Sequence, residues 1–136
     1  MSALEPLRTQ LKGDLITPAS AAYDSARQLW NGMLDKRPAG IARCSGAADV
    51  VACVRYAAEH DILLAVRGGG HNVAGLASCD EGLVIDLTRM KGGHVDANDR
   101  TIQAQAGMCW GDFDRETHLV GLATTTASCR RRASAD

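Results

Sequence analysis

The sequence predicts an α+β fold in which a small parallel β-α-β subdomain is followed by the start of an antiparallel subdomain. Two observations carry this prediction. Continuous apolar runs over residues 61–66 and 82–90 are typical of strands that are buried on both faces of a parallel sheet. Around Asn98 and Asp99, by contrast, apolar and polar residues alternate, as they do in a two-stranded hairpin.

The first half of the chain alternates between predicted helices and strands. Residues 23–38 carry apolar side chains at helical spacing and end at a proline, so we expect a helix there. A short strand over residues 40–44 precedes a helix over residues 46–60, for which Ser45 is the expected N-cap. A strand over residues 61–66 then completes a parallel β-α-β unit.

The second half is predicted to change from parallel to antiparallel pairing near residue 92. A third apolar strand lies within residues 82–90, and Val95 and Ile102 flank the polar turn of the hairpin. Trp110 begins a helix that Gly121 is expected to close. We divide the chain into an N-terminal helical segment (1–36), a main domain (37–127) and a tail (128–136).

Composition excludes several classes of function. The chain has 136 residues, enough for one domain with a core, and its 15 basic and 16 acidic residues nearly cancel. We therefore expect no nucleic-acid partner and no membrane association, and a cytoplasmic location, since neither a secretory signal nor a spanning apolar run is visible. The five cysteines form no C-x-x-C pair, so we expect structural thiols and no metal site.

The stretch VRGGGHNVAGL, residues 66–76, follows a predicted strand and is the main candidate site. It is not a Walker A motif, because Leu76 and Ala77 stand where Lys and Ser or Thr are required, and Val73 breaks the G-x-G-x-x-G fingerprint. Consecutive glycines can adopt left-handed dihedrals and turn their N–H groups toward an anion such as a pyrophosphate. An ordinary glycine turn is the alternative. We expect His71 to be exposed beside this loop, as a general base, a phosphate contact, a nucleophile or a residue without a function.

Three stretches together carry a family resemblance: RPAGIARC, VRGGGHNVAGLASCDEGLVIDLTRM and GMCWGDFDRETHLVGLATTT. They resemble the FAD-linked oxidases of the berberine-bridge-enzyme and 6-hydroxynicotine oxidase type, over roughly residues 23–126. The resemblance implies that residues 37–127 are part of a PCMH-type FAD-binding domain. It also implies an oxidoreductase that takes electrons from a small-molecule substrate and passes them to O₂.

The same resemblance implies specific roles for residues of the loop. The FAD pyrophosphate is expected on the backbone of residues 67–72, with the turn at Gly75 completing the cradle; the residues are Arg67, Gly68, Gly69, Gly70, His71, Asn72 and Gly75. His71 is the expected covalent link to the 8α-methyl carbon of the flavin. Some family members form a second bond through a cysteine, and Cys129 lies near that place. The catalytic residues and the substrate stay unassigned.

The end of the chain departs from the family pattern. Relatives continue with a segment close to G-V-x-S-T-T-G-V-G-G, whereas this chain ends in SCRRRASAD. Codons for residues 128–136 exist that, read two bases later, encode Val-Ser-Thr-Thr-Gly-Val-Gly-Gly. We therefore predict a frameshift shortly before Ser128 and a truncated product. The alternative function is a non-catalytic remnant that binds flavin or a nucleotide weakly or not at all.

Overall fold

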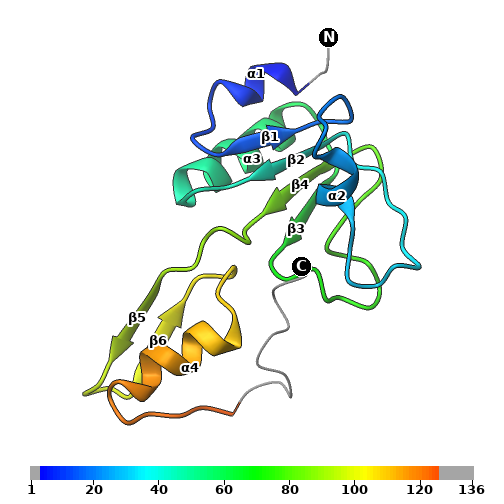
Figure 1. Cartoon of the computed structure of the whole chain (residues 1–136). Coiled ribbons are helices and arrows are strands. Elements are labelled where there is room, and N and C mark those ends of the chain that lie inside the picture. The colour runs from blue at the N-terminus through cyan, green and yellow to red at the C-terminus, as the bar shows by residue number, and fades with distance from the viewer. Residues whose placement is uncertain (1–3, 126–136) are drawn as a thin grey trace.

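The computed structural model describes residues 4–125, which form two lobes joined by the chain between β4 and β5 (Figure 1). The predicted α+β class is confirmed. The elements in chain order are α1 (Glu5–Arg8), β1 (Asp14–Ile16), α2 (Tyr23–Arg27), β2 (Gly40–Arg43), α3 (Ala47–Glu59), β3 (Leu64–Arg67), β4 (Leu83–Asp86), β5 (Gly93–Asp96), β6 (Thr101–Ala104) and α4 (Trp110–His118).

The first lobe is built on a four-stranded sheet of order β1-β2-β4-β3. The strands β2, β4 and β3 are parallel, as the apolar runs predict, and β1 pairs antiparallel with β2. The β-α-β unit is not closed by direct pairing of its two strands, because β4 lies between β2 and β3. The N-terminal segment was expected to be helical only, but it supplies β1 to this sheet.

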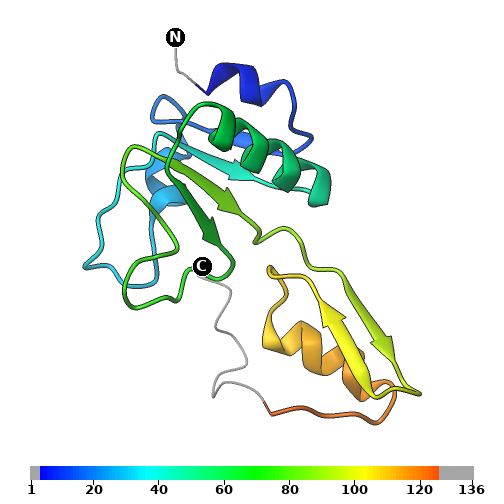
Figure 2. The same ribbon diagram turned by 180° about the vertical axis from the view of Figure 1, so that it is seen from behind.

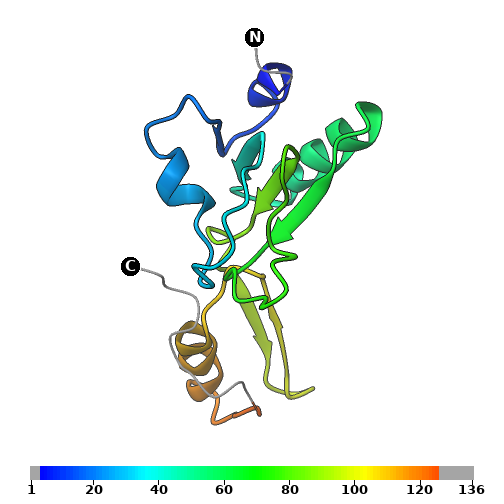
Figure 3. The same cartoon turned by 90° about the vertical axis from the view of Figure 1, so that its right-hand side faces the viewer.

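Helices cover both faces of the sheet. Seen from behind, α3 lies across one face (Figure 2), and the side view places α2 against the other (Figure 3). Leu83 and Ile85 of β4 belong to the core that includes Cys53 and Tyr56 of α3, whereas Val84 packs in a second core with residues of α2. The central strand β4 is therefore buried along its whole length.

The strand β3 differs from its prediction as a strand buried on both faces. It lies at the edge of the sheet; Val66 in β3 is 53% exposed, and Leu63, just before β3 and inside the predicted strand, is 63% exposed. The apolar run alone predicted burial on both faces, but a strand with one neighbour cannot be enclosed like the central strand β4.

Two further local predictions are wrong for identifiable reasons. The helix expected over residues 23–38 ends at Arg27. Only Tyr23 and Ala26 reach the core, whereas Trp30 and Met33 are exposed and add no burial that would extend the helix. The pair Asn31-Gly32 also has low helix propensity. The N-cap of α3 is Gly46, not Ser45 as predicted. Instead the Ser45 hydroxyl and N–H both donate to the buried carboxylate of Asp49.

The second lobe confirms the predicted hairpin. The strands β5 and β6 pair with Val95 opposite Ile102, and α4 lies beside them (Figure 1). The turn is held by the Asp96 carboxylate, which accepts the N–H groups of Asn98 and Asp99. Gly121 follows α4 with a φ of 68° and donates to the His118 carbonyl, as expected for a residue that closes a helix.

The predicted frameshifted tail, with Cys129, lies outside the described residues. In the part of the chain that is described, no helix is long and apolar enough to cross a membrane.

Candidate functional site

The carboxyl ends of the three parallel strands bring charged residues into one row. The register places Arg43 of β2 and Arg67 of β3 on either side of Asp86 of β4. Arg67 Nη2 lies 2.8 Å from Asp86 Oδ2, and Arg43 Nε lies 3.7 Å from the same oxygen. Open parallel sheets place their ligands at this edge.

Asp86 is a buried carboxylate that stays ionised. Its Oδ1 accepts the Thr88 N–H at 3.0 Å and the Thr88 hydroxyl at 2.6 Å. Burial by itself would raise the pKa of Asp86, but the charge of Arg67 and the hydrogen bonds from Thr88 outweigh burial and hold the pKa below its ordinary value. Two guanidinium groups thus face one carboxylate, which leaves an excess of one positive charge in this row.

A cavity of about 410 Å³ opens above this row. One wall is the backbone of Gly68, Gly69 and Gly70, which leaves the end of β3. Another part of the wall comes from α2 and the residues after it. The lining residues outside the glycine run are Ser25, Ala26, Gln28, Leu29, Trp30, Arg43, Arg67, Asp86 and Thr88. A glycine wall above a net positive floor suits a phosphate-containing ligand.

Each of the three positions 68–70 requires or favours glycine for a different structural reason. Only Gly70 has a left-handed φ, of 70°, although the sequence suggested that several of them could. Gly68 is needed because a Cβ there would lie 2.8 Å from the Ala106 carbonyl oxygen. Gly69 is exposed and lines the cavity, so it is the position at which a ligand can touch bare backbone.

His71 is half-buried, not exposed as predicted, and it lies next to the cavity wall without lining the cavity. Its Nε2 is buried and has no hydrogen-bond partner among the described residues. The imidazole meets the ring of Trp30 edge-on, with a centroid distance of 6.1 Å and an interplanar angle of 68°. A buried ring nitrogen without a partner is uncommon, and it points to a ligand or a reaction partner.

Asn72 and Gly75 shape the loop and do not line the cavity. The Asn72 side chain accepts the Leu76 N–H at 3.1 Å, and the Asn72 carbonyl accepts the Gly75 N–H at 3.1 Å. Gly75 has a φ of 75°, and a Cβ there would lie 2.8 Å from Leu34 Cδ1. The structure therefore brings Arg67 and the three glycines together around the cavity, and leaves His71, Asn72 and Gly75 outside its lining.

Sequence reasoning missed Arg43, Asp86 and Thr88. Both Arg43 and Asp86 lie inside predicted strands, but the observed strands end at these two residues, earlier than the predicted ends at residues 44 and 90. The sequence therefore did not show that the two side chains stand at the carboxyl edge of the sheet, where ligands bind. It missed Leu29 and Trp30 for a different reason, since they were assigned to the apolar face of a helix that ends before them.

Metal-ligand groups and cysteine thiols do not gather at the cavity, as far as residues 4–125 are concerned. Across residues 4–125, no group of three or more His, Cys, Asp or Glu side chains is placed to hold a metal ion. Cys44, Cys53 and Cys79 are buried free thiols, and burial raises the pKa of Cys79.

Residues 38–133 match a family model described as an FAD binding domain. The chain belongs to this FAD binding domain family. Its cofactor is FAD, and the resemblance drawn from the sequence is confirmed. The matched residues include the glycine loop, His71 and all three residues of the Arg43-Asp86-Arg67 row.

Curated relatives and solved structures agree with the family. The chain is 37% identical over 116 residues to (R)-6-hydroxynicotine oxidase of Paenarthrobacter nicotinovorans, covering 85% of this chain and 25% of that protein. It is 35% identical over 117 residues to the FAD-linked oxidoreductase hasG of Aspergillus fumigatus, again covering 85% of this chain and 25% of the relative. The chain thus spans about a quarter of the length of these relatives.

The solved structures show the same fold. The crystal structure of 6-hydroxy-D-nicotine oxidase from Arthrobacter nicotinovorans superposes with a TM-score of 0.78 at 36% identity, covering 86% of this chain and 25% of that one. Chitooligosaccharide oxidase superposes with a TM-score of 0.81 at 27% identity, covering 93% and 28%.

Proposed function

We propose that this chain is the part of a flavin-dependent oxidoreductase that holds the FAD pyrophosphate, in the cavity between residues 68–70 and α2. The observation that carries the proposal is the glycine wall above the Arg43-Asp86-Arg67 row. Backbone N–H groups near Gly69 and the excess positive charge of the Arg43-Asp86-Arg67 row supply what a diphosphate requires. Asn72 and Gly75 contribute by holding the loop, not by touching the cofactor.

We further propose that His71 bonds covalently to the flavin. Its buried Nε2 has no protein partner to occupy the nitrogen lone pair, so the imidazole is free to act as a nucleophile. When bound, FAD would supply an electron-poor ring as the electrophile and as the acceptor of the two electrons released, and His71 would hold it through an imidazole nitrogen. The chain's own contribution is to hold the imidazole directly after the glycine wall, with its Nε2 left unpaired.

The complete protein is proposed to oxidise a small molecule and to reduce O₂. This part of the proposal is supported by the names of two similar proteins, a 6-hydroxynicotine oxidase and a chitooligosaccharide oxidase. Those substrates belong to those proteins, and they differ in chemistry from one another. We therefore assign the reaction class and leave the substrate open.

Acid precipitation after incubation with FAD tests the proposal. The chain should retain yellow colour in the pellet, and His71→Ala should bind FAD but release it in acid. Trypsin frees residues 68–89 as one peptide, which should carry the mass of the flavin. His94→Ala, at an exposed histidine in the other lobe, is the matched control and should still retain the flavin. Flavin that binds but leaves entirely in acid would overturn the covalent link, and no binding would favour the non-catalytic alternative.

A further inference from the structure

The tryptophan that meets His71 comes from a segment distant in sequence. Residues 28–39, here named the α2–β2 segment, connect α2 to β2 and carry Leu29 and Trp30 past the glycine loop. Leu29 Cδ2 lies 3.6 Å from the point where a Cβ on Gly70 would be. Trp30 then lines the cavity and places its ring against the imidazole of His71.

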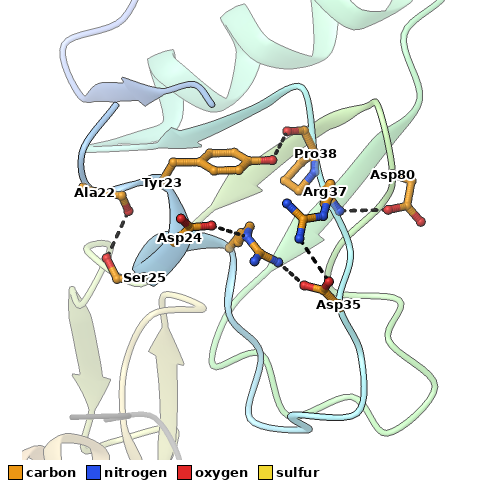
Figure 4. Close-up of polar contacts among 9 residues, drawn as sticks. Ala22, Tyr23, Asp24, Ser25, Asp35, Arg37, Pro38 and Asp80 are labelled. Carbon is orange, nitrogen blue, oxygen red and sulfur yellow. Dashed lines mark hydrogen bonds and ion pairs between the residues drawn. The ribbon is translucent and has the colours of Figure 1, made fainter. Parts of the chain in front are cut away.

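The α2–β2 segment is a closed loop whose two ends are tied to each other (Figure 4). Arg27, the last residue of α2, forms ion pairs with Asp24 and with Asp35. Near the other end, the Tyr23 hydroxyl donates to the Pro38 carbonyl at 2.7 Å. The α2–β2 segment, which carries Trp30, is therefore attached to α2 near both of its ends.

The same segment is also tied to the loop that carries His71. Lys36 Nζ donates to the carbonyl oxygens of Gly75 and Ser78 at 3.0 and 3.1 Å. The Arg37 N–H donates to Asp80 Oδ1 at 2.8 Å (Figure 4). The backbones of Trp30 and His71 are thus held in one framework, although Trp30 itself is 64% exposed. The ring of Trp30 fills no core, and it lies where it meets His71 and lines the cavity, so a role in the site is the natural explanation for it.

We propose that Trp30 is a positioning residue for His71, whose ring holds the imidazole in the orientation from which it bonds to the flavin. This inference rests on the covalent link proposed above. Because Nε2 accepts and donates no hydrogen bond among the described residues, no polar contact at that atom fixes the imidazole. The edge-on contact with Trp30 restricts its rotation without occupying the nitrogen. Orientation of a reacting group of this kind contributes to rate more than to affinity.

The first test measures the rate of acid-stable flavin formation at saturating FAD, so that changes in affinity do not enter. Trp30→Ala should slow the reaction by about tenfold or more, the scale expected for a misplaced reacting group. Trp30→Phe keeps an aromatic edge and should restore most of the rate. Trp110→Ala removes the other tryptophan, which contacts Phe113 in the second lobe, and should leave the rate unchanged.

The second test needs no flavin. The imidazole C–H protons of His71, assigned in the NMR spectrum by their loss in His71→Gln, should shift in Trp30→Leu because the indole ring current is removed. They should not shift in Trp110→Leu.

Each outcome bears on one proposal or both. Unchanged His71 signals in Trp30→Leu, or a wild-type rate in Trp30→Ala, would overturn the role of Trp30 while the covalent link stands. A wild-type chain that forms no acid-stable flavin would overturn the link and the role of Trp30 together.

Discussion

Arg67 and Asp86 form a buried ion pair, with Nη2 2.8 Å from Oδ2, at the carboxyl ends of two neighbouring parallel strands. The pair has two roles, one in stability and one in the site. It neutralises a guanidinium that would otherwise be buried alone, and it forms the floor of the cavity assigned to the pyrophosphate. The second guanidinium, that of Arg43, is only 3.7 Å from the same carboxylate and keeps the floor positive.

Removal of the Asp86 charge should destabilise the fold. In Asp86→Asn the shape is kept but Arg67 is left buried without a counter-charge, which typically costs about 3 kcal/mol or more. Urea unfolding measures the free energy directly. Asp14→Asn is the control, since the Arg89–Asp14 pair is exposed and should contribute less than about 1 kcal/mol. Equal losses in the two variants would contradict the distinction between the buried and the exposed pair.

Acid should weaken the fold through the same carboxylate. The pKa of Asp86 in the folded chain lies below its unfolded value, so its contribution to stability is complete above the unfolded pKa, about 3.9, and is lost as the pH falls from there through the folded pKa. Asp49, which accepts the N–H groups of Lys12, Gly13 and Ser45, has its pKa lowered too and adds to the loss. Unfolding curves measured from neutral pH down to pH 3 should therefore show falling stability, with a shallower fall in Asp86→Asn. A fall of the same slope in that variant would show that other groups govern the acid response.

Gly69→Val should weaken FAD binding without unfolding the chain. Gly69 is exposed, lines the cavity and has no left-handed φ, so we expect a valine there to obstruct the cavity without straining the backbone. We expect Kd to rise by about tenfold, equivalent to about 1.4 kcal/mol, in a titration that follows quenching of FAD fluorescence. Gly46→Val, placed in open space at the start of α3, should bind FAD as the wild type does. Unaltered affinity in Gly69→Val would show that the diphosphate lies elsewhere.

His71→Ala should keep its fold. The imidazole makes no hydrogen bond at Nε2 and has one aromatic contact, with Trp30. Its loss should therefore change the free energy of unfolding by no more than about 1 kcal/mol. The loop should keep its course because Gly70, Asn72 and Gly75 set it. Thermal unfolding followed by circular dichroism measures this. A large loss of stability would mean that the imidazole holds the loop together, which would weaken its assignment as a free nucleophile.

The parallel core, the hairpin at Asn98 and Asp99, and the position of the glycine loop beside His71 could all be predicted from the amino-acid sequence. These features follow from local patterns: apolar runs for strands, alternation for the hairpin, and glycines where the chain must turn sharply. The family resemblance followed from the same residues, because the loop and its flanking strand are contiguous in the chain.

The residues that surround the loop could not be predicted in this way, because they depend on how the strands are ordered in the sheet. The order β2-β4-β3 puts Asp86 between Arg43 and Arg67, and makes β3 an edge strand in place of a strand buried on both faces. Trp30 lies outside the helix that was predicted to contain it, and its ring contacts His71. The physical reason is that strand order and ion pairing join residues far apart in the chain, and the energies that select them arise only when those residues are packed together.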